Sequence, residues 1–325
     1  MIELRGIQKT YRVAKRGKGV FPALKALFLR DYQEVRAVDG VSFSVGRGEI
    51  VGFIGPNGAG KSTTIKIMSG ILVPDSGECR VMGHTPWKDR KRYVAEIGVV
   101  FGQRTQLWWD VPVQDSYDLL RDIYAIPEAR YRDNLDRLVQ AMNLSGLLHV
   151  PLRQLSLGQR MGCEIVASLL YDPQILFLDE PTIGLDAVAK LAVRQFIARL
   201  NRERKTTVIL TTHDMDDIGA LTDRILLIGK GRILYDGSMR AIREKHDRVR
   251  TLSVSFAPCA GPVEADGAEL VLWEEERAVY RVDAGSANIA GVISALGERL
   301  SILDMTVESR QLEEIIADLY REHEV

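Results

Sequence analysis

A glycine-rich stretch of this chain has the composition of a phosphate-binding loop. Residues 55–63 read Gly-Pro-Asn-Gly-Ala-Gly-Lys-Ser-Thr and fit the pattern G-x-x-x-x-G-K-[ST]. Glycines let backbone N–H groups turn inward without Cβ clashes, and a helix that starts there adds its positive end. Lys61 can then reach the β- and γ-phosphates of a nucleotide, and the Ser62 hydroxyl can coordinate Mg²⁺. We predict a phosphate site formed by Gly55, Asn57, Gly58, Gly60, Lys61, Ser62 and Thr63.

Two carboxylates follow a second apolar stretch, Ile175–Leu178. Asp179 and Glu180 stand at the carboxyl end of this predicted strand, which is the end where ligands bind in an open α/β sheet. Asp179 is placed to hold Mg²⁺ through water, and Glu180 is placed to orient and deprotonate an attacking water. Alone, such an acid pair more often marks the start of a capped helix. Downstream of a phosphate loop it becomes a strong signal for a metal site.

Alternating short apolar runs and helical stretches must position these residues. An apolar run, Ile50–Ile54, comes directly before the glycine loop, and a helical stretch, Ser62–Leu72, follows it. Further predicted strands lie at Ile2–Tyr11, Val38–Val45, Glu96–Phe101 and Thr207–Thr211, with helices at about 114–170 and at Ala187–Leu200. Such alternation predicts an α/β fold, with a mainly parallel sheet that carries helices on both faces.

The pattern changes after about Lys245. Strands are predicted at Thr251–Phe256 and Ala278–Val282, and helices at Ser286–Gly297 and Gln311–Glu322. We therefore predict two domains: a nucleotide-binding domain at 1–245, whose helical subdomain spans about 104–170, and a small α+β domain at 246–325.

Composition narrows the functional classes. The 325 residues carry a formal net charge of −1, so no global field favours nucleic acid. Cys79, Cys163 and Cys259 are far apart, which fits a reducing compartment without disulfides or a zinc site. No apolar stretch approaches the ~18 residues of a membrane span, so a membrane process would need another chain to cross the bilayer.

Further segments resemble, in order, the motifs of the ABC ATPase family. Leu155–Gln159 reads LSLGQ and is similar to the family's LSGGQ signature, and Pro181–Asp186 resembles the D-loop. Gln103 resembles the Q-loop glutamine, His213 the switch histidine, and Tyr11 the aromatic residue that stacks on adenine. These motifs, together with the phosphate loop and the acid pair, span about residues 1–240.

The resemblance implies roles for these residues. Gln103 would sense Mg²⁺ or the lytic water, and His213 would help hold that water and Glu180. In the family, the signature helix faces the γ-phosphate bound by a second cassette, so ATP joins a dimer. The residues implied in this contact are Ser156, Gly158, Gln159 and Asp186. Leu157 replaces the usual first glycine of the signature, and its side chain would narrow the approach to that phosphate.

As a whole, the chain resembles the ATP-hydrolysing subunit of an ABC transporter, specifically of the ABC-2 exporter type. This implies a second cassette, identical or different, separate transmembrane permease subunits, and a peripheral location on the cytoplasmic face of the cell membrane. An importer ATPase is one alternative. Another is a soluble ABC ATPase acting on ribosomes or nucleic acid, but such proteins carry two cassettes or long coiled-coil inserts, and the sequence has neither.

Two regions lie outside the catalytic set. Arg12–Arg30 is basic without an acid, and Leu24, Leu27 and Phe28 share one face of a predicted short helix. The segment up to Arg36 either lies near lipid head groups or a partner, or is a solvated excursion. Trp108 and Trp109 either serve as an anchor for a membrane partner or pack inside the helical subdomain.

Overall fold

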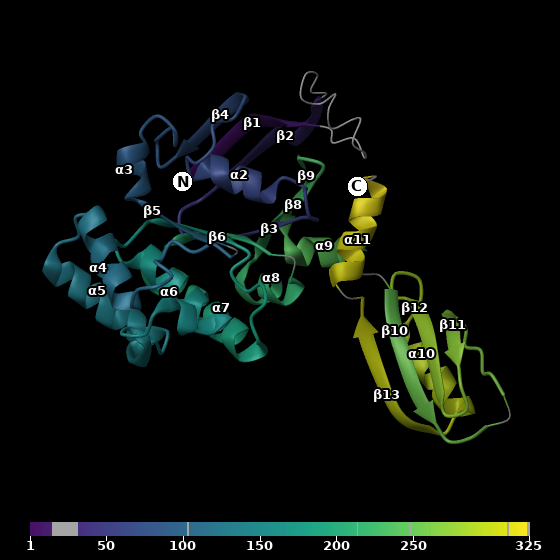
Figure 1. Ribbon diagram of the computed structural model, residues 1–325. Helices are drawn as coiled ribbons and strands as arrows, with labels where there is room; N and C mark the ends of the chain where they lie inside the picture. The colour runs from purple at the N-terminus through teal and green to yellow at the C-terminus, as the bar shows by residue number, and fades with distance from the viewer. Residues whose placement is uncertain are drawn as a thin grey trace, which may run out of the picture. The chain divides into compact units, whose positions relative to one another are not determined.

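The computed structural model describes residues 1–14, 32–102, 104–212, 214–246, 249–259, 261–310 and 312–323. The chain forms two compact units, Met1–Gly237 and Ser238–Val325 (Figure 1). The division falls earlier than the predicted boundary after Lys245. Helix α9 (Met239–His246) is grouped with the second unit, where it contacts helix α11 (Leu312–Glu322).

A six-stranded sheet forms the centre of the first unit. Its order is β5-β6-β7-β3-β8-β9, and the neighbours from β5 to β8 run parallel. The strands are β5 (Ile97–Phe101), β6 (Ile175–Asp179), β7 (Thr207–Thr211), β3 (Ile50–Ile54), β8 (Arg224–Gly229) and β9 (Arg232–Ser238). The central strands are short apolar runs that are buried on both faces, as strands of covered parallel sheets are. The predicted mainly parallel sheet is confirmed.

A second, antiparallel sheet carries the N-terminus. It has the order β2-β1-β4, formed by β2 (Tyr32–Val45), β1 (Ile2–Ala14) and β4 (Ser76–Val81). The predicted interruption from Arg12 to Arg36 is wrong at both ends, because the strands stay paired as far as Ala14 and Tyr32. The side chains of residues 32–36 are exposed, and apolar and polar residues do not alternate there. This part of β2 is therefore a strand by its backbone pairing with β1 and not by its sequence pattern. The predicted helix at Leu24, Leu27 and Phe28 lies outside the described residues.

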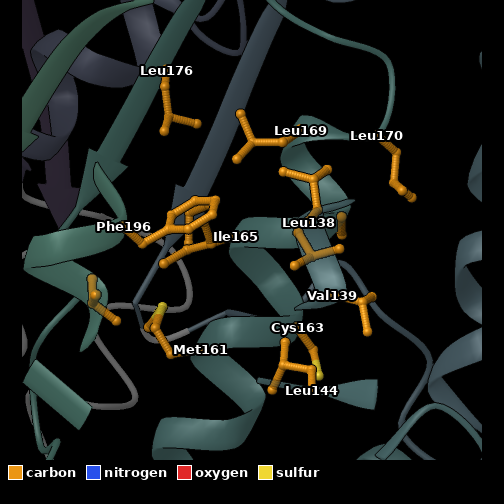
Figure 2. Close-up of a cluster of buried hydrophobic side chains, with 14 of the residues drawn as sticks. Leu138, Val139, Leu144, Met161, Cys163, Ile165, Leu169, Leu170, Leu176 and Phe196 are labelled. Atoms are coloured by element: carbon orange, nitrogen blue, oxygen red, sulfur yellow. The ribbon is translucent and has the colours of Figure 1, made fainter. Parts of the chain in front are cut away.

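Seven α-helices belong to the described part of the first unit. They are α2 (Lys61–Met68), α3 (Arg90–Val94), α4 (Val113–Ile123), α5 (Glu128–Ala141), α6 (Leu157–Leu169), α7 (Ala187–Arg204) and α8 (Met215–Leu221). Helices α2, α3, α6 and α8 contact strands of the central sheet, and α4 and α5 pack on α6. Helix α2 is shorter than predicted because the N–H groups of Ile71 and Leu72 both turn back to the Lys66 carbonyl. Buried side chains of α5, α6, α7 and β6 form one core, shown in Figure 2. This core fixes α6 against the sheet, so its N-terminus has a defined place.

The second unit is a small antiparallel sheet with a helix. The sheet order is β11-β12-β10-β13, from β11 (Ala268–Trp273), β12 (Arg277–Asp283), β10 (Val249–Phe256) and β13 (Ile302–Ser309). Its core joins buried side chains of β10 and β12 to Val292 and Leu296 of α10 (Ile289–Arg299). Among all residues that the structure describes, no helix is long and apolar enough to cross a membrane.

Candidate functional site

The glycine loop lies between β3 and α2. Gly60 immediately precedes α2 with φ 109°, a conformation that other residues rarely adopt. A Cβ at Gly60 would stand 2.3 Å from the Ala37 carbonyl oxygen of β2. The neighbouring strand thus leaves room for backbone alone at this position. A glycine-rich loop that leads into a helix is a common site for binding phosphate.

Lys61 is the first residue of α2 and is only 5% exposed. Its Nζ donates to the Gly55 carbonyl at 2.5 Å and to the Pro56 carbonyl at 3.1 Å. Burial lowers the pKa of Lys61, while the carboxylates of Glu180 and Asp179 act in the opposite direction. The ammonium therefore lies inside the loop, close to both acids, where it can contact a phosphate.

Asp179, the last residue of β6, lies beside two hydroxyl groups. Its Oδ1 accepts from Ser62 Oγ at 3.2 Å and from Thr211 Oγ1 at 2.6 Å. Mg²⁺ prefers such oxygens, keeps several waters, and takes only one or two protein ligands beside substrate phosphates. In the described part of the chain, no group of three or more His, Cys, Asp or Glu side chains could hold a metal. Ser62 and Asp179 therefore fit as the protein's contribution to a Mg²⁺–nucleotide site.

Glu180 has a strained backbone. Its φ is 55°, in the left-handed region that residues other than glycine seldom occupy. Its N–H donates to the Thr211 carbonyl and to Thr211 Oγ1, both at 3.0 Å. On the other side, the Gly102 N–H donates to the Asp179 carbonyl at 2.8 Å, and a Cβ at Gly102 would stand 2.3 Å from the Glu180 carbonyl. Such strain is typical of functional positions.

Ser62, Gly102, Asp179 and Glu180 border one cleft of about 800 Å³, whereas Gly58, Gly60, Lys61 and Thr63 of the predicted phosphate site are not part of its lining. Its lining comprises Gly55, Pro56, Asn57, Ser62, Lys66, Ile71, Phe101, Gly102, Arg104, Asp179, Glu180 and Ile183. The loop and the acid pair, distant in sequence, thus meet at one place. Sequence reasoning missed Lys66 and Arg104, two cations beside the phosphate loop; Arg104 follows Gln103 directly, which was the available signal. Gln103 and His213 lie outside the described residues.

Tyr11 lies in β1, opposite Val35 of β2 and three residues before the strand ends at Ala14. It is absent from the cleft lining. The adjacent strand β2 reaches the phosphate loop at Ala37. The adenine contact of Tyr11 stays a prediction.

The signature segment forms the start of α6. Ser156 is the N-cap: its Oγ accepts from the Gln159 N–H at 3.2 Å, and its own N–H donates to Gln159 Oε1 at 2.9 Å. This reciprocal pair is a capping box, which fixes where the helix begins. Leu157 is 39% exposed, and its Cδ2 lies 2.9 Å from where a Cβ on Gly184 would stand.

Asp186 has the same capping function for α7. Its Oδ1 accepts from the Ala189 N–H at 2.8 Å. A Cβ on Gly158 would stand 2.8 Å from the Ala189 Cβ, so the starts of α6 and α7 approach closely. Ser156, Gly158, Gln159 and Asp186 therefore come together in one region, at two helix N-termini.

The segment after position 103 is bound to α6 at two points. Glu164 of α6 is buried and accepts from Thr105 Oγ1 and from the Gln106 N–H. Burial raises the pKa of Glu164, although these hydrogen bonds act in the opposite direction. Near the start of α6, the Arg160 guanidinium lies 5.0 Å from the centre of the Trp109 ring. Sequence reasoning singled out Trp109 but missed Glu164, whose partners are remote in sequence.

A phosphate loop on a parallel sheet, with a serine and an acid pair beside it, defines a nucleoside triphosphatase of the P-loop class. A family model described as "ABC transporter" matches residues 38–183. The Nod factor export ATP-binding protein I of Ralstonia nicotianae is 33% identical, over 80% of this chain and 84% of the relative. The ABC transporter ATP-binding protein NatA of Bacillus subtilis is 30% identical, over 68% and 89%. The chain belongs to the ABC transporter family and is an ATP-binding, ATP-hydrolysing subunit.

Solved structures agree with this assignment. A dimeric, post-hydrolysis form of the ATP-binding cassette MJ0796, bound to ADP and phosphate, is 26% identical with a TM-score of 0.62. The match covers 74% of this chain and 99% of that one. Cassettes of this family dimerise and work with transmembrane subunits.

Proposed function

We propose that this chain hydrolyses Mg²⁺-ATP in the cleft between the glycine loop and the end of β6, and that this drives export. Backbone N–H groups of residues 55–63 and the Lys61 ammonium bind the β- and γ-phosphates. Ser62 and Asp179 would hold Mg²⁺, which would supply positive charge to neutralise the phosphates. Glu180 accepts the proton of the attacking water. The observation that carries the proposal is the contact of Ser62 with Asp179, which joins the loop to the acid pair.

Export is the direction that the relatives favour. Their names include Nod factor export and daunorubicin/doxorubicin resistance, the latter for DrrA of Streptomyces peucetius, 35% identical over 64% of this chain and 62% of DrrA. We infer an ABC-2 type exporter, in which two cassettes, identical or different, work on the cytoplasmic face of the membrane beside permease subunits. The ATP of one cassette then contacts Ser156, Gly158 and Gln159 of the other, with Asp186 nearby.

The permease subunit would dock at the segment after position 103. Trp108 and Trp109 are 43% and 46% exposed, so they are not core residues. Trp109 contacts Arg160 of the signature helix, and the same segment is bound to buried Glu164. A partner that binds the tryptophans would therefore contact a surface already linked to the ATP-dependent dimer.

Replacing Trp108 and Trp109 together by alanine should weaken co-purification with the membrane partner and uncouple transport. A large aromatic residue at the centre of an interface typically contributes ~2 kcal/mol or more. ATP binding by the isolated chain should change little. Val73→Ala is a control, since it removes another exposed apolar side chain of the first unit. Intact assembly together with a less stable chain would place the docking surface elsewhere.

The second unit should be dispensable for nucleotide binding. All the described residues assigned to the site lie in Met1–Gly237. A chain ending at Gly237, rather than at the originally predicted Lys245, should therefore bind a labelled ATP analogue with nearly the affinity of the full chain. A folded, soluble truncation that does not bind would show that the second unit contributes to the site.

A further inference from the structure

One buried carboxylate joins three segments that surround the catalytic acid. Asp217 of α8 has no exposed surface. Its Oδ2 accepts from Thr212 Oγ1 at 3.1 Å and from Thr182 Oγ1, and its Oδ1 accepts from Arg194 Nε at 2.5 Å. None of these four residues is in the lining of the cleft.

Two of the three donors lie close in sequence to residues assigned to hydrolysis. Thr182 is two residues after Glu180, in the segment that leads to α7. Thr212 follows β7 and directly precedes His213. Arg194 belongs to α7 itself. A single oxygen atom of Asp217 thus connects the segment after Glu180 to the segment before His213.

A second acid strengthens the same attachment. Asp214 pairs with Lys190 Nζ at 2.5 Å and with Arg194 Nη2 at 3.4 Å. Asp214 also accepts from the Asp216 and Asp217 N–H groups, which caps α8. Arg194 of α7 therefore bridges Asp214 and Asp217, so α7 and α8 cannot separate without breaking charged hydrogen bonds.

Burying a charged pair such as Asp217 and Arg194 costs free energy of folding. A protein with apolar side chains of similar volume in their place would usually be no less stable. What the carboxylate adds is a fixed acceptor for two hydroxyl groups. The strained backbone of Glu180 makes this significant, because strain of this kind persists only when the surroundings hold it on both sides. The Glu180 N–H donates to Thr211 Oγ1. Two residues after Glu180, Thr182 donates its hydroxyl to Asp217, so the backbone is held on both sides of Glu180.

We propose that Asp217 and Arg194 are positioning residues that fix Thr182 against Thr212 and thereby keep Glu180 in place for hydrolysis. This rests on the proposed role of Glu180 as the base. Asp217 itself is fully buried and lies outside the lining of the cleft. A misplacement of a catalytic group by ~1 Å can lower a rate by about 10²-fold, so loss of this acceptor should affect kcat before it affects ATP binding.

Valine variants test the connection, because valine matches threonine in shape and lacks the hydroxyl. Thr182→Val and Thr212→Val should each lower kcat by about 10–100-fold, with KM for ATP within about twofold of the parent value. The double variant should fall no further than the more damaging single variant, because either change breaks the same link through Oδ2. Asp217→Leu, which keeps the branched shape and removes both acceptor oxygens, should show the same kcat loss.

Thr207→Val is the matched control. Thr207 is buried at the other end of β7, and its Oγ1 accepts from the Gly48 N–H at 2.9 Å. This variant should lower the thermal midpoint without lowering kcat. The proposal is overturned if the Thr182 and Thr212 variants also lose only stability, or if their effects on kcat multiply. Glu180→Gln, assayed in parallel, separates the two claims: parent activity there rejects the base, whereas unchanged kcat in the valine variants rejects only the positioning role.

Discussion

Replacing Glu180 by glutamine should reduce ATP hydrolysis by about 10²–10⁴-fold, because that is the usual effect of losing a general base. The variant keeps the side-chain shape and the backbone contacts to Thr211, so ATP should still bind. Since ATP is proposed to join the two cassettes, the ATP-bound dimer should accumulate when ATP is not hydrolysed. Phosphate release and size-exclusion chromatography with light scattering measure the two effects.

The matched control is Glu78→Gln, which makes the same chemical change at an exposed position of β4. It should hydrolyse ATP at the parent rate and form no stable ATP-bound dimer. If Glu180→Gln also hydrolyses ATP at the parent rate, Glu180 is not the base. If it fails to bind ATP, its main function is in binding.

Replacing Lys61 by alanine should weaken nucleotide binding and turnover together. Hydrogen bonds to charged groups contribute ~1.5–3 kcal/mol, which corresponds to an increase in the Kd for ATP of about 10–150-fold. The loss should be larger for ATP than for AMP, since Lys61 is placed to contact the β- and γ-phosphates. Equilibrium binding of fluorescent ATP and AMP analogues measures the difference.

Two controls make the Lys61 result interpretable. Lys88→Ala removes an exposed lysine of the same unit and should leave binding unchanged. A thermal melt of Lys61→Ala is needed because Lys61 also donates to the Gly55 and Pro56 carbonyls, so its loss could loosen the loop. A folded variant with parent affinity for ATP would reject the phosphate-loop assignment.

The sequence identified the parts of the site that local chemistry dictates. The loop at 55–63 needs glycine for its backbone, and the acids at 179 and 180 end an apolar strand downstream of that loop. The loop and the acids together therefore predicted the site. That they share a cleft follows from the parallel sheet, whose strand ends lie at one edge. The strain at Glu180 and the hydrogen bonds to Asp217 depend on contacts between segments that are distant in sequence. No local sequence pattern predicts them.

The missed strands have a similar explanation. β13 exposes most of its side chains and β11 exposes half of them, so neither has the buried apolar face that would mark it as a strand. They form because β10 and β12 offer backbone partners. The division between the two units lies earlier than the predicted boundary for the same kind of reason. Helix α9 is grouped with the second unit because it contacts α11, and its own composition does not reveal this.

Backbone hydrogen exchange tests most directly where the nucleotide binds. The account predicts that Mg²⁺-ATP slows the exchange of amides at 58–63 in the Glu180→Gln variant, because those N–H groups donate to phosphate oxygens. Amides of the second unit, such as those of β10, should exchange unchanged. Unaltered exchange at 58–63 under saturating ATP, with protection elsewhere, would contradict the central claim that this loop holds the phosphates.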